Sequence, residues 1–386
     1  MTINFDLTEE LQDIRKVARD FAVKEIQPTV DEDDKAHRFR RDLVQKMADL
    51  GFFGCVIPEE YGGNEMGWLA ATIIAEEISR VHASMRLPFN MNPNGPGCTI
   101  LRYGTEEQKM KYLPGLVDGS LLGMFAITEP DSGSDVGSMR TKAIKDGDSY
   151  IVNGNKMWIS NATVCDMGLL YAYTDPAKKI KGMSAFVIDM NTPGITIEPI
   201  TDKLGTWGAP VGSITFENCR IPASALLGKE GQGFKICMEQ LNDTRLGCQA
   251  GGLGLAQACL DAALNYANER QQFGVPIGKF QMVTDMIAQM ATEVEAARFL
   301  VYRAAFLKDQ GRPCTLETSM GKYYVGEVVN KCADYAMKIY GSYGYSEEYP
   351  VARYYRDAKS YQIVEGTSNI QKLIIGETML GYRKRI

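Results

Sequence analysis

The sequence predicts an α+β fold in which two helical regions flank a β-domain, and three changes of pattern along the chain support this. Apolar side chains recur at helical spacing from residue 4 to about residue 120. Short β-type runs, separated by Gly, Asp, Asn and Pro, fill residues 121–225, as in a small antiparallel sandwich or barrel. Helical spacing returns near Gly233. We therefore expect two helical domains that pack into one core and a β-domain between them, at residues 1–120, 121–230 and 231–386.

Composition argues against several classes of function. The 386 residues carry a net charge of -6, which argues against a nucleic-acid-binding surface. Nine Cys are scattered without a C-x-x-C pair, as is typical of reduced thiols in the cytoplasm. Only His37 and His82 are present, so we expect no metal site and no Ser-His-Asp triad. The N-terminus lacks the features of a signal peptide, and no apolar run reaches the ~18 residues of a membrane span. We expect a cytoplasmic protein.

The first region contains four expected helices. Thr8 is the expected N-cap of the first helix, and the second and third cover about Arg41–Leu50 and Trp68–Val81. A capping box, Thr105-Glu-Glu-Gln108, opens a fourth helix that runs to about Tyr112. Between the third and fourth helices, the segment Arg86–Gly97 contains three prolines and two glycines, which are expected to interrupt regular structure.

The remaining elements follow from the same patterns. The β-type runs are 124–127, 150–152, 156–159, 168–173, 184–188, 195–199 and 213–216. The long helical segments of the last region are about 233–271, 280–310, 315–341 and 369–381.

The stretch Tyr361–Leu373 holds a polar turn between apolar residues. Glu365 follows Ile363 and Val364, Gly366 permits a sharp bend, and the three residues after it are good N-caps for the helix that follows. A carboxylate with apolar neighbours beside a helix start can serve as a general base. The alternative is a solvated loop carboxylate in front of a capped helix.

Four further stretches bear on ligand binding. Gly251–Ala256 superficially resembles a glycine-rich dinucleotide-binding loop. It lies inside a helical run with no preceding strand, however, which indicates close helix packing and no NAD site. Ile127–Asp135 is rich in hydroxyls and Gly and can cradle a pyrophosphate or a flavin edge, and Lys156–Asn161 adds an aromatic plane. Each of these two, taken alone, is more often ordinary turn or core structure than a ligand site. Arg270–Gly274, taken alone, is typical of a solvated helix C-terminus.

Taken together, four short sequence motifs, called stations below, resemble those of the flavin-dependent acyl-CoA dehydrogenase family. The resemblance extends over essentially the whole chain. The stations are Phe125–Asp135, Arg270–Gly274, Tyr340–Tyr345 and Glu365–Thr367. The resemblance implies an N-terminal α-helical domain, a middle β-barrel-like domain and a C-terminal four-helix bundle domain. It also implies FAD as cofactor, an acyl-CoA substrate, electron-transfer flavoprotein as electron acceptor, and a homotetramer built as a dimer of dimers.

By this resemblance FAD is held by residues from the β-domain and the C-terminal domain, and Arg270 and Gln281 come from a neighbouring subunit. The full set is Phe125, Ile127, Thr128, Gly133, Ser134, Trp158, Ile159, Ser160, Arg270, Gln281, Lys338, Ile339, Tyr340, Gly341, Ser342, Thr367 and Asn369. Lys338 stands where the family usually has Gln, and Ser342 where it often has Gly, which puts those local contacts in doubt.

The resemblance also implies substrate contacts and a reaction. The implied substrate contacts are Arg86, Leu87, Ser134, Met238, Leu241, Asn242, Asp243, Arg245 and Gly366. Glu365 removes the proton alpha to the thioester, and a hydride passes from the beta carbon to the flavin. The backbone of the Glu365–Gly366 turn and a flavin ribityl hydroxyl polarise the thioester oxygen.

Two substrates remain open from the sequence. Arg86 is similar to the station that grips the distal carboxylate in glutaryl-CoA dehydrogenases, although it can also be a surface Arg at a helix end. Leu87 and Val364 resemble the non-decarboxylating type of anaerobic bacteria. Against this, the prolines of Asn90–Pro96 are expected to break the pocket helix, and a rebuilt polar wall suits a ring, as in cyclohexane- and cyclohexene-carboxyl-CoA dehydrogenases. An acyl-CoA oxidase and a nucleic-acid-binding relative are more remote alternatives.

Overall fold

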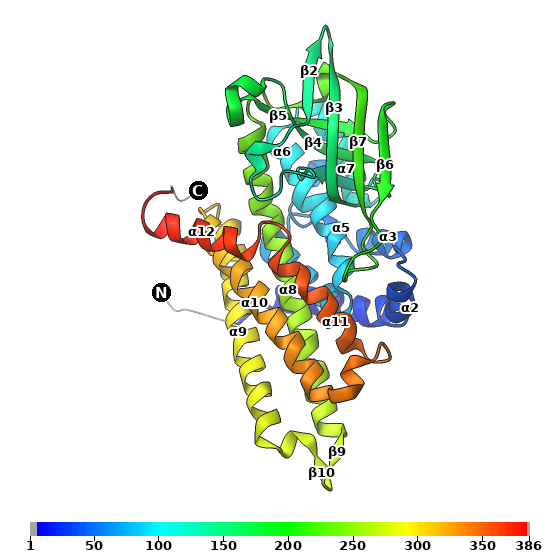
Figure 1. The fold of residues 1–386 in the computed structure, drawn as a ribbon, viewed down its shortest axis with the longest axis vertical. Helices are drawn as coiled ribbons and strands as arrows, with labels where there is room; N and C mark the ends of the chain where they lie inside the picture. The colour runs from blue at the N-terminus through cyan, green and yellow to red at the C-terminus, as the bar shows by residue number, and fades with distance from the viewer. Residues whose placement is uncertain (1–5, 384–386) are drawn as a thin grey trace.

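The computed structural model describes residues 6–383, and its fold is α+β as predicted (Figure 1). Helices occupy the chain up to Asp118, strands run from Gly123 to Leu227, and helices resume at Gly233. The sheet forms one end of the molecule, and the long C-terminal helices extend away from it, with the N-terminal helices packed beside them (Figure 1).

The N-terminal helices begin where the caps predict. The Thr8 hydroxyl accepts a bond from the Leu11 N–H, and the Thr105–Gln108 capping box is complete. The last of these helices runs on to Asp118 despite Pro114, because its buried face includes Leu113 and Leu116. The helices are α1 (Glu9–Phe21), α2 (Val30–Lys35), α3 (Arg41–Asp49), α4 (Gly67–Val81), α5 (Leu87–Phe89), α6 (Cys98–Tyr103) and α7 (Glu106–Asp118).

The expectation that prolines break the chain between Arg86 and Gly97 is wrong. The backbone stays helical through a short 3-10 turn (Ala83–Arg86), α5 and a π-helix (Asn90–Gly97) that joins α6 directly. A π-helical turn is wider than an α-helical turn, so the carbonyls near a proline find other donors. The Gly95 carbonyl, for example, accepts from the Thr99 hydroxyl at 2.6 Å and from the Cys98 N–H.

Asn92 anchors this π-helix to the sheet. Its fully buried amide donates to the carbonyls of Leu116 (3.0 Å) and Leu121 (2.9 Å) and accepts from the Gly123 N–H (3.0 Å). The π-helix is therefore fixed to the first residue of the first strand, which leads into the predicted flavin loop.

The sheet has eight strands in the order β6-β7-β3-β2-β4-β5-β8, and β1 pairs with β4 in parallel. Most other pairings are antiparallel, and the contact between β2 and β4 is a second parallel one. The strands are β1 (Gly123–Ala126), β2 (Lys142–Asp146), β3 (Ser149–Ser160), β4 (Met167–Tyr173), β5 (Met183–Asp189), β6 (Ile195–Pro199), β7 (Val211–Pro222) and β8 (Leu226–Leu227).

The C-terminal region is built on a long helix, α8 (Gly233–Glu269), that runs from the sheet to the opposite end of the molecule (Figure 1). There a small hairpin of β9 (Gln271–Gln272) and β10 (Val275–Pro276) turns the chain back. The helices that follow are α9 (Gln281–Asp309), α10 (Thr315–Tyr340), α11 (Pro350–Ala358) and α12 (Ser368–Met379). The sequence pattern missed α11, whose buried face mixes the polar Arg353 and Asp357 with small apolar residues.

The glycine-rich run of α8 packs against neighbouring helices, as predicted. A Cβ on Gly254 would lie 2.1 Å from the Glu76 carbonyl of α4, and one on Gly252 would lie 2.5 Å from Val325 of α10. The three helices can approach this closely only because these side chains are absent. The two helical regions thus share one core, since α4 packs directly on α8.

Within residues 6–383 no helix is apolar over a length sufficient to cross a membrane, and no three potential metal ligands cluster. None of the nine cysteines is in a disulfide.

Candidate active site

The turn that carries Glu365 has a strained backbone held by neighbours. Glu365 has φ +59° and Gly366 has φ +86°, both in the left-handed region that costs a residue with a side chain about 1–2 kcal/mol. Arg245 Nε donates to the Glu365 carbonyl at 3.0 Å, and Gln371 Nε2 donates to the Gly366 carbonyl at 3.0 Å. Thr367 then caps α12 by accepting from the Ile370 N–H at 3.3 Å. On this turn the Glu365 side chain points inward, toward Thr244 and Asn90.

The Glu365 carboxylate is half-buried and hydrogen-bonded, so the solvated-loop alternative is wrong. Thr244 Oγ1, on α8, donates to Oε2 at 2.7 Å. Asn90 Nδ2, on the π-helix, donates to Oε1 at 3.3 Å and to the Thr244 carbonyl at 3.0 Å. Three segments distant in sequence therefore converge on one carboxylate, which is positioned to accept a proton.

Arg86 is a buried cation in the same region. It is 5 % exposed, which excludes the surface-arginine interpretation. Its Nε donates to the Tyr361 hydroxyl at 3.3 Å, and its guanidinium carbon lies 5.2 Å from the centre of that ring. Its Nη1 has no hydrogen-bond partner among the described residues. A guanidinium so placed can accept an anionic ligand.

Gly251 makes the space for Arg86. A Cβ at this position would lie 2.1 Å from Arg86 Cδ and 3.0 Å from the Tyr361 hydroxyl. The glycine run that resembled a dinucleotide loop therefore serves helix packing and also makes room for the buried Arg86. Nothing in the sequence pattern signalled this second role.

The two predicted flavin stations of the β-domain lie side by side. The Met157 N–H, on β3, donates to the Thr128 carbonyl, just after β1, at 2.9 Å. Trp158 has φ +60° and is 55 % exposed, which is unusual for so large an apolar side chain. Ile159 beside it is buried, and Gly133 and Ser134 are exposed on the loop.

A fully buried ion pair joins these stations, and the sequence analysis missed it. Lys156 Nζ donates to Glu129 Oε1 at 2.9 Å and to the Ile127 carbonyl at 3.2 Å. The Glu129 carboxylate also accepts from the backbone N–H groups of Arg140 and Thr141. Burial lowers the pKa of Lys156, and it also opposes charge on Glu129, whose pKa the Lys156 charge nonetheless holds below its ordinary value. Both residues stand inside the predicted motifs, which is the signal that could have found them.

The predicted C-terminal flavin residues divide into two groups. Thr367 and Asn369 stand beside Glu365, whereas Arg270 and Gln281 flank the β9–β10 hairpin at the far end of α8 (Figure 1). Near that end, the Arg270 guanidinium lies 5.3 Å from the Tyr343 ring, and the loop of Gly341 and Ser342 is exposed. One chain alone therefore does not bring the two groups together.

Lys338 and its neighbours belong to the same far end. Lys338 is exposed and pairs with Asp334 at 2.7 Å. Ile339 is buried, and Tyr340 stacks on Tyr266 with ring centres 4.0 Å apart.

The predicted substrate residues of α8 have different surroundings. Met238, Leu241 and Asn242 are half-buried, and Asn242 Oδ1 has no partner among the described residues. Asp243 is buried, and its carboxylate pairs with Arg102 at 2.9 Å and also with Lys308. The negative charge of Asp243 is therefore balanced by two cations of the same chain. Leu87 and Phe125 are half-buried, as is Ser160.

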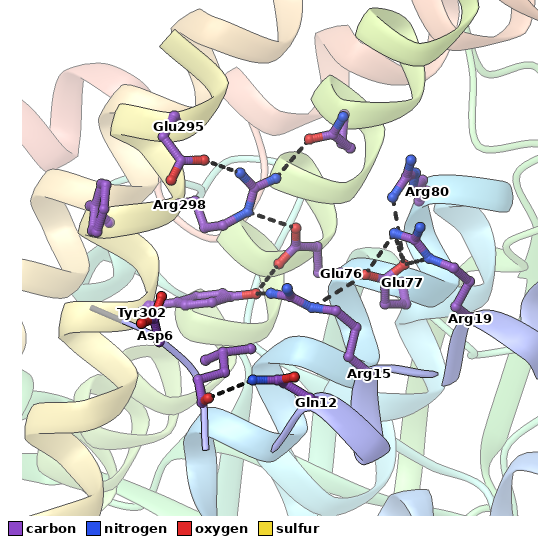
Figure 2. A pocket seen from close by; sticks show the side chains of 13 residues that line it. Asp6, Gln12, Arg15, Arg19, Glu76, Glu77, Arg80, Glu295, Arg298 and Tyr302 are labelled. Carbon is purple, nitrogen blue, oxygen red and sulfur yellow. Dashed lines mark hydrogen bonds and ion pairs between the residues drawn. The ribbon is translucent and has the colours of Figure 1, made fainter. Parts of the chain in front are cut away.

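A separate charged pocket of about 720 Å³ lies between α1, α4, α8 and α9 (Figure 2). Glu76 accepts from Arg298 (3.2 Å) and from the Tyr302 hydroxyl (2.6 Å), and Glu77 accepts from Arg19 (2.9 Å). Burial raises the pKa of Glu77 and the nearby Glu76 charge adds to the rise, whereas Arg19 and Arg15 partly counteract it. The pocket contains none of the predicted site residues, and its paired charges join the N-terminal helices to the C-terminal ones.

Comparison with known proteins places this geometry in a family. Models of the N-terminal, middle and C-terminal domains of acyl-CoA dehydrogenases match residues 8–120, 124–219 and 231–380. The chain belongs to the acyl-CoA dehydrogenase family. It is thus an oxidoreductase of a family that binds FAD, and the resemblance seen in its motifs is confirmed.

Individual relatives cover the whole chain. Glutaryl-CoA dehydrogenase of Desulfococcus multivorans is 52% identical over 387 residues, 99% of each protein. A solved structure of glutaryl-coenzyme A dehydrogenase in complex with glutaryl-CoA has a TM-score of 0.97 at 52% identity, and covers 99% of this chain and 98% of that one. A chain solved in work on the electron transferring flavoprotein of Acidaminococcus fermentans has a TM-score of 0.96 at 41% identity, covering 98% of this chain and 100% of that one.

Proposed function

We propose that this acyl-CoA dehydrogenase introduces an α,β double bond into a short dicarboxylic thioester similar to glutaryl-CoA, without decarboxylation. The observation that carries the proposal is Arg86, a buried guanidinium with an unpartnered Nη1 in the same region as Glu365. A buried cation to which no carboxylate is directly bonded is costly unless a ligand supplies the anion. The similarity to a glutaryl-CoA dehydrogenase supports the same substrate class.

We assign FAD to the surface beside Trp158, and the residues present fit a flavin. Trp158 exposes an indole face, and the adjacent loop offers the Thr128 hydroxyl, the Ser134 hydroxyl and the open backbone of Gly133, near which a Cβ would meet nothing within 4 Å. When bound, FAD supplies the acceptor for the hydride that leaves the beta carbon. The buried Lys156–Glu129 pair keeps the two flavin stations in register.

Glu365 is the proposed base for the alpha proton. The hydrogen bond from Thr244 fixes one carboxylate oxygen, and the longer bond from Asn90 leaves the other oxygen more available. Arg86 would hold the distal carboxylate and so fix the acyl chain along the pocket, which places the alpha carbon in a reproducible position.

The absence of decarboxylation is proposed from the same residues. Loss of CO₂ requires the carboxylate to leave its cation and the remaining carbanion to find a proton. Arg86 would stabilise the carboxylate where it is bound. By resemblance to the family, Leu87 and Val364 replace polar or Tyr residues of the decarboxylating enzymes, and neither carries a hydroxyl to donate a proton.

We propose a homotetramer, a dimer of dimers, with electron-transfer flavoprotein as electron acceptor. Arg270 and Gln281 lie far from Glu365 along α8, so a second copy is needed to bring them to a flavin (Figure 1). Next to them Phe273 and Met282 are 91 % and 79 % exposed, as expected of a face that another copy covers. Light scattering of the yellow protein should give the tetramer mass, and a fully flavin-loaded monomer would contradict this assembly.

A ring thioester such as cyclohexane- or cyclohexene-carboxyl-CoA is the second candidate. The π-helix that replaces an ordinary helix in the pocket wall favours it, since Asn90 Oδ1 and Asn94 Oδ1 are buried and lack partners among the described residues. Such unpartnered polar atoms can line a binding site that is shaped for a ring thioester.

The deciding experiment is anaerobic bleaching of the flavin by glutaryl-, butyryl- and cyclohexanecarboxyl-CoA, with product analysis. We expect glutaryl-CoA to reduce the flavin fastest and to yield the five-carbon unsaturated thioester. A four-carbon product would overturn the non-decarboxylating assignment. Fastest reduction by the ring thioester would transfer the proposal to the second candidate. Reoxidation in air compared with reoxidation by electron-transfer flavoprotein separates a dehydrogenase from an oxidase.

A further inference from the structure

Tyr361 connects the buried guanidinium of Arg86 to the turn that carries Glu365. It lies in the short 3-10 helix Lys359–Gln362, four residues before Glu365, and is 2 % exposed. Its ring and hydroxyl contact Arg86, while its backbone carbonyl faces α10. Each of these two ends has a buried cationic partner.

The hydroxyl end fixes Arg86. Arg86 Nε donates to the Tyr361 hydroxyl at 3.3 Å, and the guanidinium also lies over the ring, 5.2 Å from its centre. Burial raises the pKa of Tyr361 to about 12, so the phenol is neutral and can accept this bond. With Nε engaged, the unpartnered Nη1 side of the guanidinium is the side left for a ligand.

The carbonyl end is held by Lys322 of α10. Lys322 is 1 % exposed, and its Nζ donates to the Tyr361 carbonyl at 2.8 Å. The chain then turns through Ile363 and Val364, whose N–H groups both donate to the Ser360 carbonyl at 2.9 and 3.0 Å. A displacement of Tyr361 would therefore be passed to Glu365 through a short, bonded turn.

Three glycines also leave room for Tyr361. A Cβ on Gly252 would lie 3.0 Å from Tyr361 Cδ1, one on Gly251 3.0 Å from its hydroxyl, and one on Gly326 3.0 Å from its carbonyl. Helix faces without side chains thus surround the residue on two sides, α8 and α10, and define a single position for it.

We infer that Tyr361 is a positioning residue that sets the place of Arg86 and of Glu365 together, and so matches the acyl length at which a carboxylate-bearing thioester presents its alpha carbon to the base. This inference rests on the proposed function for its substrate, but the two links through Tyr361 exist in the protein without substrate. Removing the Tyr361 hydroxyl should weaken the binding of a distal carboxylate by Arg86. Removing the Lys322 ammonium should lower the local stability of the Glu365 turn.

The test uses the flavin-loaded enzyme with Tyr361→Phe and Lys322→Met, and with Tyr150→Phe as matched control. Tyr150 is another buried tyrosine with a bonded hydroxyl, to Glu230, but in the β-domain. For Tyr361→Phe we expect KM for glutaryl-CoA to rise about tenfold, the loss of one buried hydrogen bond, with kcat within about twofold and butyryl-CoA kinetics unchanged. The control should change neither substrate.

Hydrogen exchange supplies the arm that needs no substrate. Lys322→Met should accelerate amide exchange in residues 361–367 about tenfold without lowering protection in α8, and should reduce kcat for both thioesters. Unchanged exchange there, or an equal effect of Tyr361→Phe on both substrates, would overturn the inference. If the wild-type enzyme does not oxidise glutaryl-CoA, the proposed substrate fails, while the exchange result still decides the role of Tyr361. If Lys322→Met does not fold, exchange in Tyr361→Phe and Arg86→Met decides it: faster exchange in 361–367 supports the coupling, and wild-type exchange in both contradicts it.

Discussion

The Thr244 hydroxyl donates a 2.7 Å hydrogen bond to Oε2 of Glu365, across 121 residues of sequence. A bond to a charged acceptor is among the stronger ones in proteins, so it fixes the rotation of the carboxylate. Because the bond from Asn90 to Oε1 is longer, at 3.3 Å, Oε1 is the oxygen better able to accept a substrate proton. The geometry thus assigns different tasks to the two oxygens of one carboxylate.

Glu365→Gln should abolish proton abstraction while leaving the fold and flavin content intact. An amide has the same shape but cannot take up the proton, so flavin reduction by a cognate thioester should slow by at least about 10²–10⁴-fold. Single-turnover bleaching measures this, and thioester affinity should change little. Reduction at near the wild-type rate would remove Glu365 from its role.

Arg86→Met should discriminate between dicarboxyl and monocarboxyl thioesters. Methionine fills part of the buried volume but provides no charge, so a bound distal carboxylate would lose a partner, at a cost on the order of 2–5 kcal/mol. Affinity for glutaryl-CoA should therefore fall strongly, and affinity for butyryl-CoA should not. Arg220→Met is the control, because Arg220 is 57% exposed and pairs with Asp146 on the sheet surface. Equal losses for both thioesters would argue against a carboxylate-binding role.

Gly251→Ala should damage the pocket through packing alone. Its Cβ would lie 2.1 Å from Arg86 Cδ, so Arg86 or α8 must move, and overpacking of this kind typically costs about 1–3 kcal/mol. Gly376→Ala in α12 is the matched substitution, since a Cβ there meets nothing within 4 Å. It should be neutral or stabilise the helix by about 0.5–1 kcal/mol. Thermal melting and KM for glutaryl-CoA, measured on both variants, should separate them, and similar behaviour of the two would contradict the packing argument.

Asp357→Asn should change how stability depends on pH. Asp357 is fully buried at the end of α11, and burial raises its pKa to about 6, although the bond from the Thr206 N–H and the charges of Arg353 and Arg356 favour its ionised form and Asp34 opposes it. An unfolded Asp titrates near 3.9, so the folded state binds this proton more tightly. The corresponding stability is fully present below about pH 4 and is lost as pH rises through about 6.

Asparagine can still accept the bond from Thr206 but does not ionise. The free energy of unfolding of Asp357→Asn relative to wild type should therefore increase from pH 4 to pH 7 by on the order of 2–3 kcal/mol. Its melting temperature relative to wild type should rise over the same range. Asp146→Asn on the sheet surface is the control, because Asp146 is 58% exposed. Parallel melting curves for wild type and Asp357→Asn over this range would show that Asp357 does not titrate as described.

Much of the architecture was predictable because its signals are local. Thr8, Thr105 and Thr367 cap their helices by bonds that span three residues, so the pattern of a few neighbours determines where each helix begins. Helical spacing and alternating strands likewise indicate which side of a segment faces the core. The motifs around Thr128, Trp158 and Glu365 were visible for the same reason, as runs of residues whose chemistry is unusual in ordinary turns.

Local signals failed where a neighbouring segment changed the outcome. Prolines near Asn90 indicate a break, yet the buried amides of Asn90 and Asn92 bond to α8, to the end of α7 and to β1, and they hold the segment in a π-helix. The short helix α11 was overlooked because its inward polar residues are bonded to partners on distant elements, such as Asp357 to the Thr206 N–H.

The sequence by itself therefore determined the helical and β regions, the family motifs and the identity of the candidate base. Only the tertiary structure decided that Arg86 is buried, that Gly251 makes room for it, and that Tyr361 joins it to the Glu365 turn. Arg86 and Tyr361 are separated by 275 residues, and burial of a charged side chain depends on atoms from several elements at once. No short window of sequence contains that information. Arginine is usually exposed, so its burial can be recognised only when the elements that cover it are known.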